Sequence, residues 1–117
     1  MKKLVWLVDS QSSLKTFPSS VQDDIGFALY LAQVGDTHTN AKPLRGFGSG
    51  VMEIAALDRS GTYRAVYTVS IGDSIYVVHV FQKKSKVGIA TPKPEMELLR
   101  RRLNQLRNEL KHAKENS

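Results

Sequence analysis

The 117-residue chain contains no cysteine, which excludes disulfides, thiolate zinc sites, iron–sulfur clusters and a cysteine nucleophile. It also lacks an apolar run approaching the ~20 residues that span a bilayer. The apolar run that follows Lys2 and Lys3 is cut at Asp9 after five residues, whereas a secretory signal needs ~7–15. Residues 4–8 therefore indicate a buried strand. We expect a cytoplasmic protein with no membrane partner.

The composition of the chain is that of an ordinary globular domain. Charged residues make up 24% of the chain and apolar residues 41%, so the composition does not favour disorder. A chain of this length can bury a core without a metal or a disulfide to hold it. No repeat or linker divides it, and we expect residues 1–117 to form a single domain.

The positive charge is confined to the second half of the chain. Residues 1–60 hold six basic and six acidic side chains, whereas residues 61–117 hold eleven basic and five acidic ones, so the net charge of +6 comes from the second half. A one-sided basic excess suggests a polyanionic partner, either nucleic acid or an acidic protein. For residues 100–102 and 111–114, a solvated helix face is the simpler interpretation.

The hydrophobic pattern predicts an α+β fold with a mainly antiparallel sheet of about four strands, helices packed on one face, and a C-terminal helix. Ser20 and Asp23 have the spacing of a capping box, and Gly35 ends the first helix. The helices are expected from Pro18 to Gly35 and over about 95–114, the strands over 4–8, 51–57, 63–71 and 74–83, and loops over 9–17 and 36–50, the second of which could include a short helical turn. The apolar face of the first helix consists of Val21, Ile25, Ala28, Leu29 and Ala32. Met96, Leu99, Leu103, Leu106 and Leu110 recur at steps of three and four along the last helix.

The dipeptide Gly72-Asp73 indicates a two-residue hairpin, which sets the register of the last two strands. In that register Arg64 lies opposite Phe81, Val66 opposite His79, and Thr68 opposite Val77. Because side chains alternate, one sheet face carries Arg64, Val66, Thr68, His79, Phe81 and Lys83. The other face carries Tyr63, Ala65, Tyr67, Val69, Tyr76, Val78 and Val80, and is the expected seat of the helices.

The first of these faces suits single-stranded RNA, because cations and an aromatic ring can hold phosphates and bases. An unpaired mid-strand arginine is costly to bury, so Arg64 should meet solvent, an anion or Glu53, and an ion pair with Glu53 is compatible with substrate contact. RNA cleavage needs no metal in principle, because the ribose 2′-hydroxyl can attack the adjacent phosphate. Arg64 would stabilise that phosphate, Lys83 or His79 would transfer protons, and Phe81 would stack on a base. A histidine in the position of His79 is more often a hydrogen-bonded structural residue than a catalyst, and no metal or other cofactor is predicted.

The chain also resembles the phage-derived HigB-like branch of the RelE/ParE toxins. The resemblance covers about residues 3–105 and rests on the order of four segments, namely Lys42-Pro43-Leu44-Arg45-Gly46-Phe47-Gly48-x-Gly50-Val51-x-Glu53-Ile54, Tyr63-Arg64-x-Val66-Tyr67, His79-x-Phe81-Gln82-Lys83-Lys84-Ser85 and Thr91-Pro92. It implies the toxin of a type II toxin–antitoxin pair, with a small microbial RNase-like fold. It also implies inhibition of translation by cutting mRNA, often in the ribosomal A site.

The resemblance implies roles for particular residues and partners. Arg64 matches the strand arginine that contacts the scissile phosphate in relatives that are RNases. Lys42 and Arg45 would bind the backbone of mRNA or rRNA. Lys83, Lys84 and Lys86 would lie near the other end of the site, where Lys84 and Lys86 are expected to bind RNA. The implied partners are the ribosome, mRNA and a cognate antitoxin, typically with a helix-turn-helix, through which operator DNA would be bound. The His-Tyr terminus that some relatives use is absent, so the general acid and base stay open.

Two other functions remain open from the sequence. A ParE-like toxin would poison DNA gyrase without cutting RNA, and a non-toxic relative would bind only an antitoxin or an operator complex. The glycines at 46, 48 and 50 do not form a phosphate loop, because no Lys-Ser/Thr follows them and a strand rather than a helix comes next.

Overall fold

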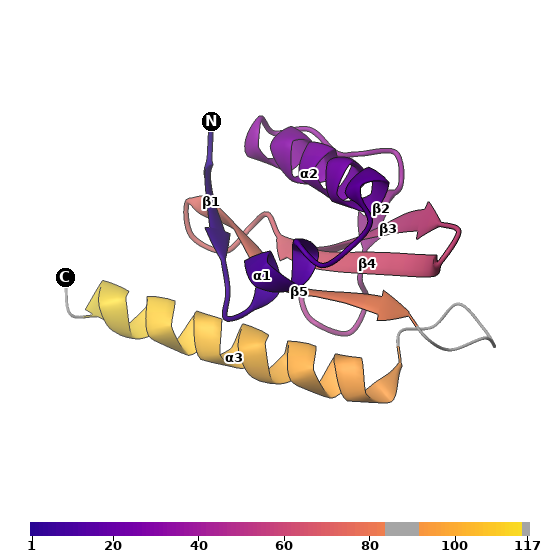
Figure 1. Cartoon of the computed structure of the whole chain (residues 1–117). Helices are drawn as coiled ribbons and strands as arrows, with labels where there is room; N and C mark the ends of the chain where they lie inside the picture. The colour runs from indigo at the N-terminus through magenta and orange to yellow at the C-terminus, as the bar shows by residue number, and fades with distance from the viewer. Residues whose placement is uncertain (84–91, 116–117) are drawn as a thin grey trace.

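The fold was obtained as a computed structural model, which describes residues 1–83 and 92–115 (Figure 1). Within these residues, five strands and three helices follow one another along the chain. Their bounds are β1 (Lys3–Trp6), α1 (Ser10–Leu14), α2 (Ser19–Gln33), β2 (Ala41–Pro43), β3 (Val51–Asp58), β4 (Gly61–Thr68), β5 (Ser74–Lys83) and α3 (Lys93–Glu115).

The strands form one sheet in the order β1-β5-β4-β3-β2. Only β1 runs parallel to its neighbour, β5, and the other pairs are antiparallel. The predicted α+β class and mainly antiparallel sheet are confirmed. Two short elements lie where the sequence predicts loops: α1, which has five residues, and β2, which has three. Neither is long enough to show a period in the sequence.

Helices cover both faces of the sheet, with α2 on one side and α3 on the other (Figure 1). The larger hydrophobic core lies on the sheet face that α1 and α2 cover. In it, Ile25 and Leu29 of α2 pack with Ala65 and Tyr67 of β4. On the opposite face, Leu99 and Leu103 of α3 pack on Val66 and Phe81. The sequence pattern left this second face open for RNA, and α3 covers a large part of it.

A β-bulge divides the hairpin of β4 and β5 into two registers. Arg64 pairs with Phe81 and Val66 with His79, as predicted, but Tyr67 then pairs with Val77, and Thr68 with Tyr76. The predicted pairing of Thr68 with Val77 is therefore wrong. The two-residue turn is also wrong, because residues 69–73 connect the strands. A bulge inserts one extra residue and reverses the alternation beyond it. Val78 consequently joins the α3 core rather than the α2 core.

The amphipathic pattern of α2 agrees with the structure, but its predicted cap does not. Its buried residues are those predicted: Val21, Ile25, Ala28, Leu29 and Ala32. No side chain caps its first turn, and the Ser20 hydroxyl instead donates to Oδ1 of Asp58, 3.3 Å away in β3. Gly35 follows the helix end with φ of +85°, a conformation that favours glycine.

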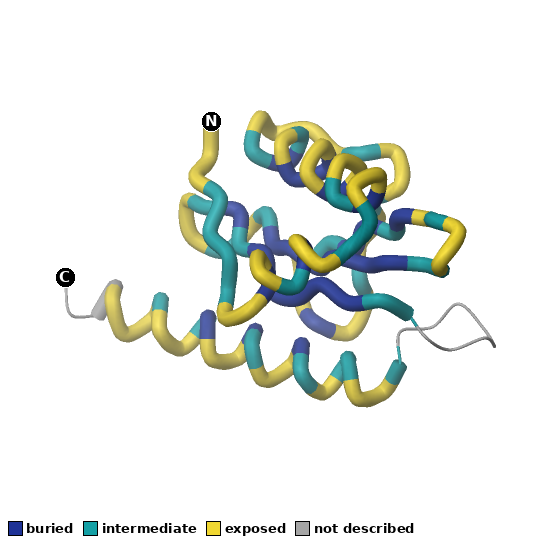
Figure 2. The backbone as a smooth tube through the Cα atoms, viewed as in Figure 1, coloured by how far each residue is buried: buried dark blue, intermediate teal, exposed yellow. Residues whose placement is uncertain are grey.

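Helix α3 is the long C-terminal helix that the leucine spacing predicted. Leu99, Leu103 and Leu106 are buried, and the outward face is exposed (Figure 2). Burial of each such leucine contributes roughly 1.5–3 kcal/mol. No helix within the described part of the chain is long and apolar enough to cross a membrane.

Candidate functional site

A buried ion pair between β3 and β4 forms the centre of the candidate site. Nη1 of Arg64 donates to Oε1 of Glu53 at 2.6 Å, and their side chains are only 10% and 3% exposed. The strand register places Ala55 opposite Arg64, so Glu53 lies two residues away on the same sheet face. The carboxylate offsets the cost of burying the guanidinium and holds it in one orientation. The ion pair proposed from the sequence is present.

Lys83 lies at the end of β5, on the face that carries Arg64. It pairs with Thr62 and is half-buried. Loss of hydration lowers the pKa of Lys83, and the positive charge of Arg64 lowers it further, whereas Glu53 acts in the opposite direction. These three side chains therefore interact electrostatically, and their arrangement brings an ammonium closer to the pH range in which it can exchange a proton.

A hollow of 630 Å³ opens beside this cluster, at the edge of the sheet formed by β2 and β3. Arg64 and Lys42 line it. Lys42 pairs with Glu53 and therefore lies on the same sheet face, where its side chain is exposed. Arg45 is exposed just after β2. The other lining residues are Asp24, Thr39, Asn40, Ala41, Ala55, Ala56, Leu57 and Thr62.

His79 lies on the same sheet face but beneath α3. Its Nε2 is 2.5 Å from Oε2 of Glu95, and its Nδ1 is 3.2 Å from Nη1 of Arg102. Burial lowers the pKa of His79 and Arg102 adds to this effect, whereas Glu95 opposes it. Arg102 also binds Oδ1 of Asp9 at 2.9 Å. Both ring nitrogens therefore have partners within the fold, and these contacts fasten α3 to β5 and to the loop after β1.

Phe81, the predicted base-stacking residue, is 6% exposed and belongs to the α3 core. Its ring also stacks on His79, with centroids 5.2 Å apart and planes 19° from parallel. In this conformation the ring offers little surface to a nucleotide base. Lys84 and Lys86, which were predicted to bind RNA, lie outside the described residues.

The contacts of α3 with the rest of the site were not predicted, although its sequence carries a signal for them. Glu95 and Arg102 fall at the same helical spacing as Leu99 and Leu106, on the face that packs against the sheet. Charged residues within an apolar stripe require partners. Arg100 and Arg107 also contact the 46–48 loop, through the ring and the carbonyl of Phe47.

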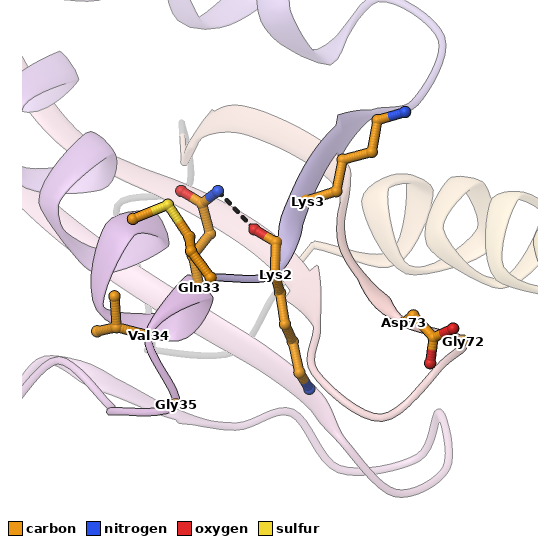
Figure 3. A pocket seen from close by; sticks show the side chains of 8 residues that line it. Lys2, Lys3, Gln33, Val34, Gly35, Gly72 and Asp73 are labelled. Carbon is orange, nitrogen blue, oxygen red and sulfur yellow. Dashed lines mark hydrogen bonds between the residues drawn. The ribbon is translucent and has the colours of Figure 1, made fainter.

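Another hollow, of 690 Å³, lies at the opposite edge of the sheet, near the N-terminus (Figure 3). The start of β1, the end of α2 and Gly72-Asp73 line it, and the amide of Gln33 donates to the Lys2 carbonyl at 2.8 Å. None of the predicted site residues that the structure describes borders this hollow.

Comparison with known protein families identifies the family of this chain. A family model described as "Phage derived protein Gp49-like (DUF891)" matches residues 12–104. The chain belongs to the Gp49-like family. The match runs from α1 into α3 and includes the whole Arg64–Glu53 cluster of this Gp49-like protein. No curated protein matches the chain.

The Gp49-like family is RelE-like and toxin-like, which agrees at a coarse level with the resemblance seen in the sequence. Membership is consistent with the toxin of a toxin–antitoxin pair and implies a cognate antitoxin as partner.

Proposed function

We propose that this Gp49-like protein is the toxin of a type II toxin–antitoxin pair, of the HigB-like branch, and that it inhibits translation by cleaving mRNA on the ribosome. The observation that supports this most directly is the buried Glu53–Arg64 pair beside Lys83 and an open hollow. A fixed guanidinium at a surface opening is suited to bind a phosphate. Exposed Lys42 and Arg45 would hold the RNA backbone.

The proposed chemistry uses groups of the RNA and of the protein. The 2′-hydroxyl oxygen attacks the adjacent phosphorus, the bond from phosphorus to the 5′-oxygen breaks, and the products are a 2′,3′-cyclic phosphate and a 5′-hydroxyl. Arg64 stabilises the charge on the phosphate oxygens. Lys83 transfers a proton to or from the reacting oxygens, and its lowered pKa favours that role. His79 acts as a positioning residue that holds α3, because Glu95 and Arg102 occupy its ring nitrogens.

The experiment is induction of the protein in cells, followed by primer extension on abundant mRNAs. We expect cuts at defined positions with the wild type and none with Arg64→Ala. Because this substitution removes the guanidinium that Glu53 binds in the buried pair, Arg64→Lys serves as a second variant that keeps the charge but loses the planar guanidinium. We expect at least a tenfold loss of cleavage with it, at unchanged protein level.

Other outcomes separate the alternatives. Growth arrest with intact mRNA would contradict the RNase proposal and favour a target such as gyrase. Harmless expression of a folded protein would contradict the toxin proposal itself. Lack of activity on naked RNA decides little, because a ribosome-dependent enzyme takes part of its positioning from the ribosome.

A further inference from the structure

Two arginines of α3 hold the glycine-rich loop between β2 and β3. Arg100 and Arg107 lie about two helical turns apart, so both project from the same face of the helix. Nη2 of Arg107 donates to the carbonyl of Phe47 at 2.5 Å. A Cβ atom at Gly48 would lie 2.8 Å from that nitrogen, and Gly48 has φ of +95°, so both the contact and the conformation favour glycine. The loop is therefore held closely against the helix.

Arg100 contacts the same loop but keeps most of its donors available. Its guanidinium carbon lies 4.9 Å from the centroid of the Phe47 ring, in a cation–π contact. Phe47 is only 4% exposed, so its ring is a fixed platform, whereas Arg100 is exposed. The hydrogen bond that Arg100 makes within the described residues is long, 3.4 Å from Nη1 to the carbonyl of Gly46. Because a guanidinium carries five N–H donors, Arg100 presents an oriented set of donors to solvent.

The loop connects this arginine with the cluster around Arg64. Lys42 lies on the sheet face of Arg64 and lines the same hollow. Two residues further on, Leu44 packs in the α3 core together with Phe47. The chain from Lys42 to Phe47 therefore runs along that sheet face, from the hollow towards α3.

Arg45 and Arg100 bring two positive charges to this loop. Arg45 is exposed and directly precedes Gly46, whose carbonyl Arg100 contacts. Among the ion pairs of the described residues, none includes either arginine. Like charges at neighbouring positions repel each other, and an anion that contacts both removes this repulsion. Guanidinium groups bind the paired oxygens of a phosphate well, because their donors match its geometry.

We propose that Arg45 and Arg100 form a second phosphate subsite for the RNA strand whose scissile phosphate lies at Arg64. The strand crosses Lys42 and the glycine-rich loop and reaches α3. Contacts remote from the reacting bond hold a substrate in register and so favour the reactive geometry. The choice of RNA as ligand rests on the proposed function, but binding is measured separately from cleavage.

The probe is hexauridylate with a 2′-O-methyl group on every ribose, so that no hydroxyl can attack a phosphate. Fluorescence anisotropy measures its affinity over a range of salt concentrations. We expect Arg100→Gln to weaken binding about fivefold near 0.1 M salt and to reduce the slope of log K against log salt by about 0.7, because one phosphate contact is lost. Arg101→Gln is the matched control. It removes the same charge from the next exposed position of α3, about 100° further round the helix, and should change binding less than about twofold.

A shorter probe tests whether the two subsites bind one strand. The 2′-O-methylated dinucleotide UpU has a single phosphate and cannot reach from Arg64 to Arg100. The amide of Ala55, which lines the hollow with Arg64, reports in an NMR titration when the hollow is occupied. At this amide, Arg100→Gln should weaken the hexanucleotide but leave the dinucleotide within about twofold of the wild type. Thermal unfolding shows whether each variant is folded, and a shift of the Arg100 Nε–H signal with the hexanucleotide tests the subsite in the wild type itself.

Three kinds of result would overturn the proposal. Equal losses in Arg100→Gln and Arg101→Gln would reveal only the effect of net charge. Equal weakening of both probes at Ala55 would mean that Arg100 acts on the hollow itself rather than at a second subsite. Failure of the wild type to bind the hexanucleotide at millimolar concentration would leave no RNA subsite at all.

This inference and the RNase proposal can fail separately. A protein that binds the hexanucleotide through Arg100 but leaves mRNA intact in cells would retain the subsite and lose the RNase proposal. Cleavage of mRNA by a protein whose affinity for the hexanucleotide does not depend on Arg100 would retain the RNase proposal and lose the subsite.

Discussion

Nη1 of Arg102 lies 3.2 Å from Nδ1 of His79, and this contact favours one tautomer of the imidazole ring. A guanidinium can only donate, so Nδ1 must present its lone pair and the ring proton must lie on Nε2, facing Glu95. This arrangement favours the neutral ring, in the same direction as the burial that lowers the pKa of His79. A second proton would have to enter on the side already occupied by Arg102.

The first prediction is a loss of stability as the pH falls below about 6.5. The pKa of His79 is lowered by burial, so the unfolded chain binds this proton more readily than the folded one. The stabilising contribution of the neutral His79 is complete at a pH above the pKa of the unfolded chain, and it is lost as the pH falls towards the pKa of the folded protein. The free energy of unfolding should decrease by up to about 1.4 kcal/mol per pH unit in that window. Urea denaturation at pH 7.5, 6.5 and 5.5 measures it.

The matched control is His79→Gln, which removes the titrating group and leaves the other two histidines in place. Its stability should change less with pH over the same window. Identical pH dependence in the two proteins would show that His79 is not the group responsible.

The second prediction concerns the pair of Arg64 and Glu53. Arg64→Met should lower the free energy of unfolding by about 3 kcal/mol, because it leaves a carboxylate that is 3% exposed without its main partner. This loss is near the low end of the range for breaking a buried ion pair, because Lys83 remains close to Glu53. The double variant Arg64→Met, Glu53→Met should lose less than Arg64→Met alone. A double-mutant cycle by chemical denaturation checks this, and additive losses would contradict it.

The third prediction separates charge from proton transfer at Lys83. If Lys83 moves a proton, both Lys83→Met and Lys83→Arg should lower the rate of mRNA cleavage about 10²–10⁴-fold, since arginine keeps the charge but holds its proton. Single-turnover cleavage on programmed ribosomes measures the rate. A wild-type rate for Lys83→Arg would assign only an electrostatic role to this position.

The fourth prediction concerns the loop between β1 and α1. Val8 has φ of +52°, which is rare for a β-branched residue, and it is 79% exposed, so little packing compensates for the strain. Val8→Asn should raise the free energy of unfolding by about 1 kcal/mol, because asparagine tolerates this conformation. Val8→Thr keeps the branched shape and should give no gain. Thermal unfolding of both variants decides the matter.

Much of the fold could be predicted from the sequence because its signals are local. The five buried residues of α2, the whole of β5 and the leucine stripe of α3 follow from periodicity alone. The bulge between Val66 and Tyr67 could not be predicted, because all the residues around it suit a strand in either register. The error then reversed the faces assigned to Tyr76 and Val78.

The candidate site was predictable only in part for a related reason. The sequence analysis could foresee the contact of Arg64 with Glu53 only on the condition that the strand of Glu53 lies next to that of Arg64, and β3 is indeed the neighbour of β4. The position of α3 on the sheet depends on tertiary contacts, which the periodicity of the sequence does not reveal. For this reason the burial of Phe81 and the engagement of His79 became visible only in three dimensions.

The contact between Asp9 and Arg102 has a consequence for how the protein is made. It joins residues 93 positions apart, and the parallel pairing of β1 with β5 likewise waits for the chain to be synthesised through Val77. Contacts of such long range slow folding. A nascent chain that ends before β5 has no partner strand for β1. The sheet therefore closes late in synthesis, and a chain truncated before Arg102 would keep the pairing of β1 with β5 but lose the contact that ties Asp9 to α3.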